Sequence, residues 1–356
     1  MSEEYKKEIR DLITSIPENT IILPQQIERG GEPTQAFSDF ITHREQGDWA
    51  EDVIFRAIKE IENGIVAVRY GRSEKIVAGE PGFSEFYEAY RKELTEIGKR
   101  PDLLIFRKED FGEFNEYDIS RYDIETLTNI VPKAIAGLEI RSSSFLVEKY
   151  NEYSNTRRME IIGNIKTCLE TLKSDYENLP DRWQQWLDSV NPDDLETLFN
   201  VPRFTKKVEV HRDTISSMKA GIGKLKKRDY LSFTPKVEDI FVINTWIQTY
   251  GVPHYYVQVF FDKSYAISFK NILEIISDET KKGERFTIER NSKNQFKSTI
   301  YLDVGEGSLL AEKIDMPKHK SICKEFERGR LLFYITFEEG NAYLDVDAFL
   351  SMIGAS

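Results

Sequence analysis

Two short apolar segments each carry a single carboxylate at a position where burial makes a charge costly. Residues 100–106 contain Asp102, and residues 136–141 contain Glu139, followed two positions later by Arg141. Alternate side chains of a strand share a face, so Glu139 and Arg141 point the same way, whereas the apolar residues between them face a core. Two carboxylates on neighbouring strands, with a cation beside the second, could hold a divalent metal next to a phosphodiester. The pattern therefore indicates metal-dependent phosphodiester hydrolysis.

The size and composition favour a folded protein without disulfides or a membrane segment. The chain has 356 residues, 40% hydrophobic and 12% aromatic, enough for one large domain or two closely joined ones. Its two cysteines and four histidines are widely separated, which fits neither a disulfide framework, a zinc site nor a histidine-rich metal site. The charged start is unlike a secretory signal, and no run of about 18 apolar residues predicts a membrane-spanning helix. We expect a soluble protein of a reducing compartment.

Charge is unevenly distributed along the chain. The formal net charge of −12 argues against nucleic acid, because DNA-binding proteins usually carry a basic surface. Positive residues nevertheless cluster at 206–207, 219–228 and 293–297. The candidates for DNA contact within the middle cluster are Lys224, Lys226, Lys227 and Arg228. Any one cluster could equally be a solvated surface, so the charge balance does not decide between the two interpretations.

The first half of the chain alternates helices with strands. A short amphipathic helix is expected over residues 3–15, followed by a loop at 17–33. From Asp48 onward, apolar residues recur at three- and four-residue spacing until Asn63-Gly64, which predicts a helix. The further elements expected are a strand at 65–70, a helix at 83–97, strands at 103–106 and 133–141, and a helix at 145–175. This order is typical of a mixed α/β core.

The second half changes character. Residues 180–229 are expected to be helical and irregular, with Trp183 and Trp186 as packing anchors. Tyr, Phe, Val and Ile then dominate. Strands are predicted at 237–245, 254–261, 265–269, 286–289, 299–302 and 331–337, with a helix near 270–276.

Several motifs together resemble a known nuclease superfamily. Pro101-Asp102, Glu139-Ile140-Arg141 and the preceding helix with residues 47–51 are similar to the PD-(D/E)xK nucleases. Residues 138–145, 231–239 and 252–262 resemble more closely the AccI-type family of type II restriction endonucleases. Together these segments cover most of residues 47–269.

This resemblance implies an α/β (α+β) fold, with a mixed β-sheet flanked by helices. The expected organisation has four parts: an N-terminal helix and loop (1–46), a nuclease core (47–145 with about 230–270), a helical insertion (146–229) and a strand-rich C-terminal region (271–356). The last region is the expected place for dimerisation and DNA recognition.

The resemblance also implies a metal site and a reaction. Asp102 and Glu139 would bind Mg²⁺, with the Ile140 carbonyl as a third ligand, and Mn²⁺ is expected to substitute; oxygen ligands suit such hard cations. The expected enzyme is a prokaryotic, cytoplasmic homodimer that cleaves both strands of a short palindrome in double-stranded DNA. A cognate DNA methyltransferase in the same host and a recognition site of the GT…AC kind are also implied.

One residue departs from the superfamily pattern. Lysine is usual where this chain has Arg141. Because arginine stays protonated in proteins, Arg141 is not a candidate general base. We expect it to hold a phosphate oxygen and stabilise developing negative charge. The alternative is a structural ion pair with Asp102 or Glu139, and Lys149 lies too far along the following helix to take over the role.

Other candidate residues each have a structural alternative. Asp48 and Glu51 have the spacing of a capping box, but an acid on this helix faces the metal site in many superfamily members. The serines Ser142, Ser143 and Ser144 are expected to open the next helix, either contacting phosphate or capping it. Lys236 is a candidate for DNA backbone contact, and His254 is expected to be structural.

Two further functional classes remain open. Arginine in place of lysine favours a nuclease-fold protein that binds DNA without cutting it. A repair nuclease that reads DNA structure is the other alternative. Which bases are read cannot be derived from the chain, because base contacts depend on the side chains that enter a groove.

Overall fold

The computed structural model describes residues 2–18, 20, 36–61, 64–72, 76–112, 116–290, 297–326 and 329–355. The chain divides into two compact units, Met1–Val147 with Leu231–Ser356 as the first and Glu148–Tyr230 as the second. None of the helices in the described ranges is long and apolar enough to cross a membrane. Most of the expected loop at 17–33 and the cluster at 293–296 lie outside the described residues.

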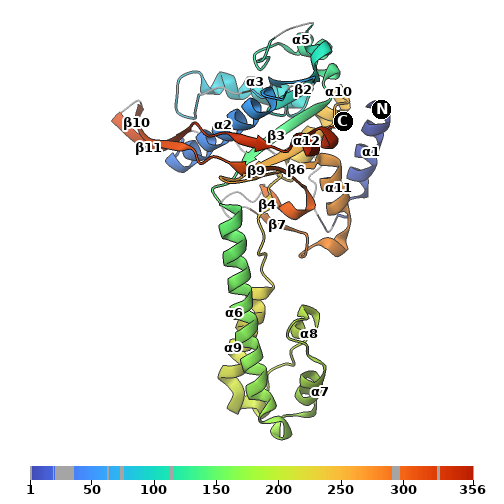
Figure 1. The fold of residues 1–356 in the computed structure, drawn as a ribbon, viewed down its shortest axis with the longest axis vertical. Coiled ribbons are helices and arrows are strands. Elements are labelled where there is room, and N and C mark those ends of the chain that lie inside the picture. The colour runs from blue at the N-terminus through green and yellow to red at the C-terminus, as the bar shows by residue number, and fades with distance from the viewer. Residues whose placement is uncertain are drawn as a thin grey trace. The chain divides into compact units, whose positions relative to one another are not determined.

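A seven-stranded sheet forms the centre of the first unit (Figure 1). Its strands in spatial order are β1 (Ile65–Arg69), β2 (Leu103–Arg107), β3 (Ala136–Ser142), β5 (His254–Val259), β6 (Ser264–Ser268), β9 (Ser308–Ile314) and β12 (Ala342–Leu344). The β3–β5 pair is parallel and the other neighbours are antiparallel. The prediction of a mixed α/β fold with a strand-rich C-terminal half is confirmed.

The alternation of side chains along the strands gives the sheet two different faces. One face, which includes Leu138, Ile140 and Val257, packs against α2 (Ser38–Lys59) and α12 (Val346–Met352) in a continuous apolar core. The burial of this face fixes the register of each strand, because a shift by one residue would expose it.

The opposite face carries Glu139 and Arg141 and is covered by helices. The covering helices are α1 (Ser2–Ser15), α10 (Asp239–Tyr250) and α11 (Phe269–Ser277). The ring of His254 on β5 lies 5.9 Å, between centroids, from Trp246 of α10 and also from Phe269 of α11. Glu139 is therefore buried beneath these helices, whereas Arg141, near the end of β3, keeps 30% of its side chain exposed.

The remaining elements of this unit are short helices and two small sheets. The helices are α3 (Phe83–Glu96), α4 (Lys108–Phe111) and α5 (Ile124–Ile130), with 3₁₀ turns at Val131–Lys133, Glu279–Lys281 and Val304–Glu306. A three-stranded sheet has the order β4 (Ser232–Phe233), β8 (Ser298–Asp303), β7 (Phe286–Arg290). The strands β10 (Lys318–Phe326) and β11 (Arg330–Glu338) pair as a two-stranded ribbon. Figure 1 shows this ribbon reaching away from the seven-stranded sheet.

The second unit is helical and has an apolar core of its own. Its helices are α6 (Val147–Lys173), α7 (Asp181–Ser189), α8 (Leu195–Phe199) and α9 (Arg212–Leu225), with 3₁₀ segments at Tyr176–Asn178 and Lys206–His211. Trp183 and Trp186 are buried in this core, with ring centroids 5.7 Å apart in an edge-to-face arrangement. Their expected role as packing anchors is confirmed.

The strand predicted at 237–245 is wrong, because this segment begins the helix α10. Its β-branched and aromatic composition suggested a strand. Its buried residues recur at helical spacing, however: Ile240, Ile243, Trp246, Ile247 and Tyr250. Gly251 ends the helix with a φ of 73°, a left-handed conformation that glycine adopts without steric cost. The pattern of buried residues therefore determined the helical structure of this segment, although its amino-acid composition favours a strand.

The helix expected to open at Asp48 begins ten residues earlier. The structure extends α2 back to Ser38, through a polar stretch that lacks an apolar repeat. Asp48 therefore lies in the helix interior, where it cannot cap the helix, and the predicted capping box with Glu51 is wrong. The strands β9, β10 and β12 and the helix α12 were not anticipated.

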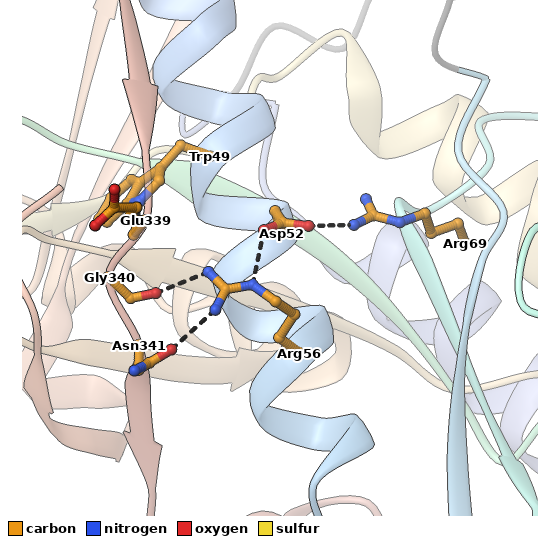
Figure 2. A network of polar contacts seen from close by, with 7 residues as sticks. All are labelled: Trp49, Asp52, Arg56, Arg69, Glu339, Gly340 and Asn341. Carbon is orange, nitrogen blue, oxygen red and sulfur yellow. Dashed lines mark hydrogen bonds and ion pairs between the residues drawn. The ribbon is translucent and has the colours of Figure 1, made fainter. Parts of the chain in front are cut away.

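A network of polar contacts joins helix α2 to one edge strand of the sheet, β1, and to the segment before the other edge strand, β12 (Figure 2). Asp52 accepts a hydrogen bond of 2.7 Å from Arg69 of β1 and one of 2.8 Å from Arg56. Arg56 also donates to the Gly340 carbonyl at 2.7 Å and to Asn341 at 2.9 Å. The Trp49 indole donates to the Glu339 carbonyl at 2.8 Å. The segment that follows β11 is thereby fixed to the same helix as β1.

Candidate active site

Asp102 and Glu139 are brought together by antiparallel pairing of β2 with β3. Leu103 pairs with Leu138, so the residue before β2 lies beside the one after Leu138. The Ile140 N–H donates to the Asp102 carboxylate at 2.6 Å, which fixes that side chain against β3. Ile140 thus contacts Asp102 through its N–H group. Metal binding by the Ile140 carbonyl stays a prediction.

The backbone at Asp102 is held just as closely. Its carbonyl accepts hydrogen bonds from the N–H groups of Tyr70 at 2.9 Å and Gly71 at 3.0 Å. A Cβ atom on Gly71 would lie 2.9 Å from the Asp102 Cα, which is closer than real Cβ contacts allow. The absence of a side chain at position 71 is therefore a condition for this placement of Asp102.

Burial and mutual repulsion make the two carboxylates electrostatically distinct. Burial, together with the charge of Glu139, raises the pKa of Asp102 to about 7. Burial alone would also raise the pKa of Glu139, but the cations Lys99 and Arg141 hold it below its ordinary value. One carboxyl is thus readily protonated and its neighbour is firmly ionised.

Glu51 of α2 faces the same group. Burial and the charges of Asp102, Asp48 and Glu139 raise the pKa of Glu51 well above its ordinary value. The capping alternative is excluded by the position of Glu51 inside α2, and its role at a metal site stays a prediction. The charges of Asp102 and Glu139 act on Glu51, so the three acids lie within electrostatic range of one another.

Arg141 makes the ion pair that was considered as its structural alternative. Its guanidinium lies 2.5 Å from Glu139 Oε1 and 3.5 Å from Asp239 Oδ2. The Arg141 side chain remains 30% exposed, so its guanidinium binds the buried acid and also reaches the surface.

Two residues of this cluster were missed in the sequence, Lys99 and Asp239. The Lys99 ammonium lies 2.6 Å from Glu139 Oε1 and 2.8 Å from Asp239 Oδ2. Burial would raise the pKa of Asp239, but Lys99 and Arg141 lower it to about 2. The pKa of Lys99 is itself raised, since Asp239 and Glu139 outweigh burial and the charge of Arg141. Lys99 is therefore a cation.

The sequence contained a signal for each of these residues. Lys99 stands three positions before Asp102, and Asp239 is the last residue of the segment 231–239 that resembles the AccI-type enzymes. Asp239 was missed because residues 237–245 were predicted to form a strand. The segment instead begins α10, whose first residue, Asp239, lies beside Lys99 and Arg141.

Lys236 lies close to the same cluster. Burial lowers its pKa; Asp239 acts in the opposite direction, and Arg141 and Lys99 lower it further. The structure thus brings the predicted contact residue Lys236 within electrostatic range of the two cations. Its contact with the DNA backbone remains a prediction.

The three serines do not open a helix, which corrects the prediction. Ser142 is the last residue of β3, and α6 begins only at Val147. The Ser143 N–H donates to the Val259 carbonyl at 2.9 Å, and the Ser144 hydroxyl donates to Gln46 at 2.9 Å. The predicted backbone donor at Ser143 is therefore engaged within the protein.

The basic cluster at 224–228 belongs to the second unit. Lys224 lies in the last turn of α9, and the other three residues follow it directly. The Lys226 ammonium lies 4.4 Å from the centre of the Phe199 ring, and the Arg228 guanidinium lies 5.9 Å from that of Tyr230. The structure gives these residues local aromatic contacts, and their DNA contacts stay a prediction.

Strand β5 places a second polar row beside Glu139 and Arg141. Parallel pairing aligns Tyr256 with Glu139 and Gln258 with Arg141. The Tyr256 hydroxyl, Gln258 Oε1 and both ring nitrogens of His254 are buried, with no hydrogen-bond partner among the described residues. Burial lowers the pKa of His254 to about 4, so this imidazole is neutral within its aromatic surroundings.

The donor set fits a hard divalent cation that shares its coordination with a substrate. Glu139 Oε2 is buried and has no hydrogen-bond partner among the described residues, which is costly for a carboxylate oxygen. Within the same described ranges, no three His, Cys, Asp or Glu side chains are grouped closely enough to enclose a metal by themselves. Mg²⁺ commonly takes one or two carboxylates and completes its shell with water and phosphate oxygens, so the pair Asp102 and Glu139 is compatible with such an ion.

Comparison with known proteins identifies the family. A search of curated proteins and a search of solved structures each found no match. A family model described as AccI restriction endonuclease matches residues 3–356, nearly the whole chain. The chain therefore belongs to the AccI restriction endonuclease family.

Proposed function

We propose that this protein is a type II restriction endonuclease that hydrolyses both strands of a short palindromic site in double-stranded DNA with Mg²⁺ as cofactor. The observation that carries the proposal is the buried cluster in which the two motif acids, Asp102 and Glu139, meet two cations, Lys99 and Arg141. Membership of a restriction endonuclease family supports DNA as the substrate.

Asp102 and Glu139 would hold the metal, with Glu51 beside them as a further acid. When bound, Mg²⁺ would supply Lewis acidity, polarising the scissile phosphate and lowering the pKa of the attacking water. The Ile140 N–H keeps the Asp102 carboxylate pointed at β3, and Glu139 stays ionised because two cations lie against it.

Lys99 and Arg141 together take the electrostatic role of the lysine that the superfamily usually has two residues after the second acid. Both touch Glu139 Oε1, and both remain protonated. Neither can therefore take a proton from water. Their role is to bind phosphate oxygens and stabilise the negative charge that grows in the transition state. Asp239 keeps both cations in place, since it bonds Lys99 at 2.8 Å and lies 3.5 Å from Arg141.

A dimer follows from the symmetry of the substrate. One active site cleaves one strand in a single docking event, and a palindrome presents its second scissile phosphate through a two-fold axis. Family membership supports a matching DNA methyltransferase in the host, because a restriction enzyme must be kept from cleaving its own genome.

Digestion of phage DNA tests the proposal directly. Purified protein with Mg²⁺ is expected to give discrete fragments, whose ends, once sequenced, would reveal whether the site is of the GT…AC kind. A smear would instead indicate a non-specific or structure-dependent nuclease. Intact DNA that is still bound by the protein would support the non-cleaving alternative, which Arg141 in the lysine position favours.

A further inference from the structure

The ribbon formed by β10 and β11 has two chemically different faces. Residues directly opposite each other on antiparallel strands share a face, so Tyr334 lies with Ile322 and Phe333 with Cys323. The first face lies toward α2: Leu332 is buried with Ile41, and Tyr334 packs against the same cluster. This face is therefore part of the folded core.

The second face is apolar but exposed. Leu331, Phe333 and Ile335 stand in one row along β11, with 53%, 58% and 38% of their surface accessible. Opposite them on β10, Cys323 faces Phe333, Ser321 faces Ile335, and the acid Glu325 faces Leu331 at one end of the row. A continuous apolar row on a projecting ribbon is unusual for a surface that stays in water, and such patches commonly mark protein interfaces.

The charges of the ribbon argue against DNA as the occupant of this face. Its lysines are already paired with acids of the same chain. These ion pairs are Lys318 with Glu339, Lys320 with Glu338, and Lys324 with Glu80. Phosphate contacts would require these pairs to be broken, whereas an apolar protein surface requires no such exchange.

Two polar residues on the exposed face favour a second copy of this chain as the partner. His319 and Glu325 lie on this face near opposite ends of β10, six residues and roughly 20 Å apart. A two-fold axis near the middle of the ribbon would place His319 of each copy beside Glu325 of the other. The apolar rows would meet at the centre, so the face is complementary to itself.

The base of the ribbon is held rigidly, which favours association. Trp49 and Arg56 of α2 bond the three residues that follow β11, namely Glu339, Gly340 and Asn341 (Figure 2). The Ile335 N–H donates to the Thr42 hydroxyl at 3.2 Å, so α2 also supports the strand itself. An element that is already ordered loses little conformational entropy on binding.

We propose that the exposed face of the β10–β11 ribbon, centred on Phe333, is the surface through which two copies of this chain form the dimer. The inference rests on the proposed function in that it names the interface of the dimer proposed there.

Sedimentation of matched variants of the full chain tests this surface. Phe333→Glu places a charge at the centre of the face and is expected to weaken dimerisation at least about 30-fold, as loss of a central aromatic contact does. Phe40→Glu is the matched control, because Phe40 is equally exposed, at 58%, but lies on α2. It should leave the dimer intact.

Cross-linking gives an independent measurement in the unmodified protein. Cys323 is exposed on the proposed face, and the chain's second cysteine is Cys168. A flexible bis-maleimide should join two chains through Cys323. The cross-link should persist in Cys168→Ser and vanish in Cys323→Ser and Phe333→Glu.

The outcomes separate failure of this surface from failure of the proposed function. The proposed surface is overturned if the Phe333→Glu protein is still a dimer. It is also overturned if the control variant Phe40→Glu loses the dimer to the same extent. A dimeric Phe333→Glu protein that no longer binds DNA would mean that the ribbon contacts nucleic acid. A wild-type chain that stays monomeric on DNA would overturn both the proposed dimer and the proposed interface. If the same sample cleaves DNA, the proposed nuclease function would still be supported.

Discussion

At the scale of single residues, the site combines acids and cations that neutralise one another in a buried place. Asp102 and Glu139 lie together on neighbouring strands, and Lys99, Arg141 and Asp239 surround Glu139. The arrangement is stable without a metal because Glu139 already has two counter-ions. In the proposed reaction, Lys99 and Arg141 would offer their remaining N–H groups to phosphate oxygens, and Asp102 with Glu139 would hold the divalent ion.

Removal of either motif acid should abolish cleavage without unfolding the protein. Asp102→Asn and Glu139→Gln keep the shape of each side chain but lose the charge that would hold Mg²⁺. Cleavage of plasmid DNA should become undetectable, while binding to a cognate duplex in Ca²⁺ persists. Glu312→Gln, at an exposed acid of β9, is the control and should cleave normally. Wild-type rates in either site variant would remove the proposed metal site.

Loss of either cation should slow the chemical step. Arg141→Ala and Lys99→Met are each expected to lower the single-turnover rate by roughly 10²–10³, as loss of one electrostatic donor does. Arg141→Lys and Lys99→Arg should keep part of the activity, because charge remains but geometry changes. Lys92→Met, at a lysine that is 77% exposed on α3, should be neutral. An unchanged rate in Arg141→Ala would leave that residue with only its structural ion pair.

The raised pKa of Asp102 predicts a pH-dependent stability in the metal-free protein. The folded pKa is about 7 and the unfolded value about 4. Between these values the folded chain binds more protons, so this group lowers the free energy of unfolding as pH rises from 4 to 7. In EDTA, Asp102→Asn should therefore gain stability relative to wild type on going from pH 5 to pH 8.

Urea unfolding of both proteins at the two pH values measures this difference. Adding Mg²⁺ at pH 8 should stabilise the wild type and leave Asp102→Asn nearly unchanged, since a ligand stabilises only a folded state that binds it. Equal differences at pH 5 and pH 8 would mean that Asp102 titrates at an ordinary pKa.

At the scale of elements, close backbone packing positions the acid. Gly71→Ala would bring a Cβ within 2.9 Å of the Asp102 Cα and force the backbone to shift. Because small displacements of catalytic groups are costly, cleavage should fall by about 10²-fold or more. Gly47→Ala in α2 is the matched control, since a Cβ there meets nothing within 4 Å. It should retain activity and gain up to about 1 kcal/mol in stability. Full activity in Gly71→Ala would show that this contact does not position Asp102.

The elements also show where sequence reasoning succeeded and where it failed. β2 and β3 were predicted because their apolar runs are local signals, and the two motif acids came with them. Helix α10 was missed because Ile, Val, Phe and Trp suit a strand until their burial pattern is known. Lys99 was missed because its partners Glu139 and Asp239 lie 40 and 140 residues away in sequence. Only the pairing of strands and the docking of α10 bring them together.

At the scale of the whole molecule, the proposed reaction requires two active sites on one duplex. Sedimentation with a short cognate duplex in Ca²⁺ should give two chains per duplex, since each chain would serve one strand. A matched duplex with a scrambled site should not support this stoichiometry at the same salt concentration. A complex of one chain with one duplex that still makes double-strand breaks would contradict the arrangement.

The parallel pairing of β3 with β5 has a consequence for how such an enzyme can change over evolution. Parallel neighbours cannot be joined by a tight turn, so a long connection between them is obligatory. In this chain the helical unit Glu148–Tyr230, with its own core, lies within that connection. Lengthening a connection that is already long costs only about 0.6 kcal/mol for each doubling. Descendants could enlarge, trim or replace this unit while the strands that carry Glu139 and Arg141 keep their register, so new binding properties could arise without rebuilding the chemistry.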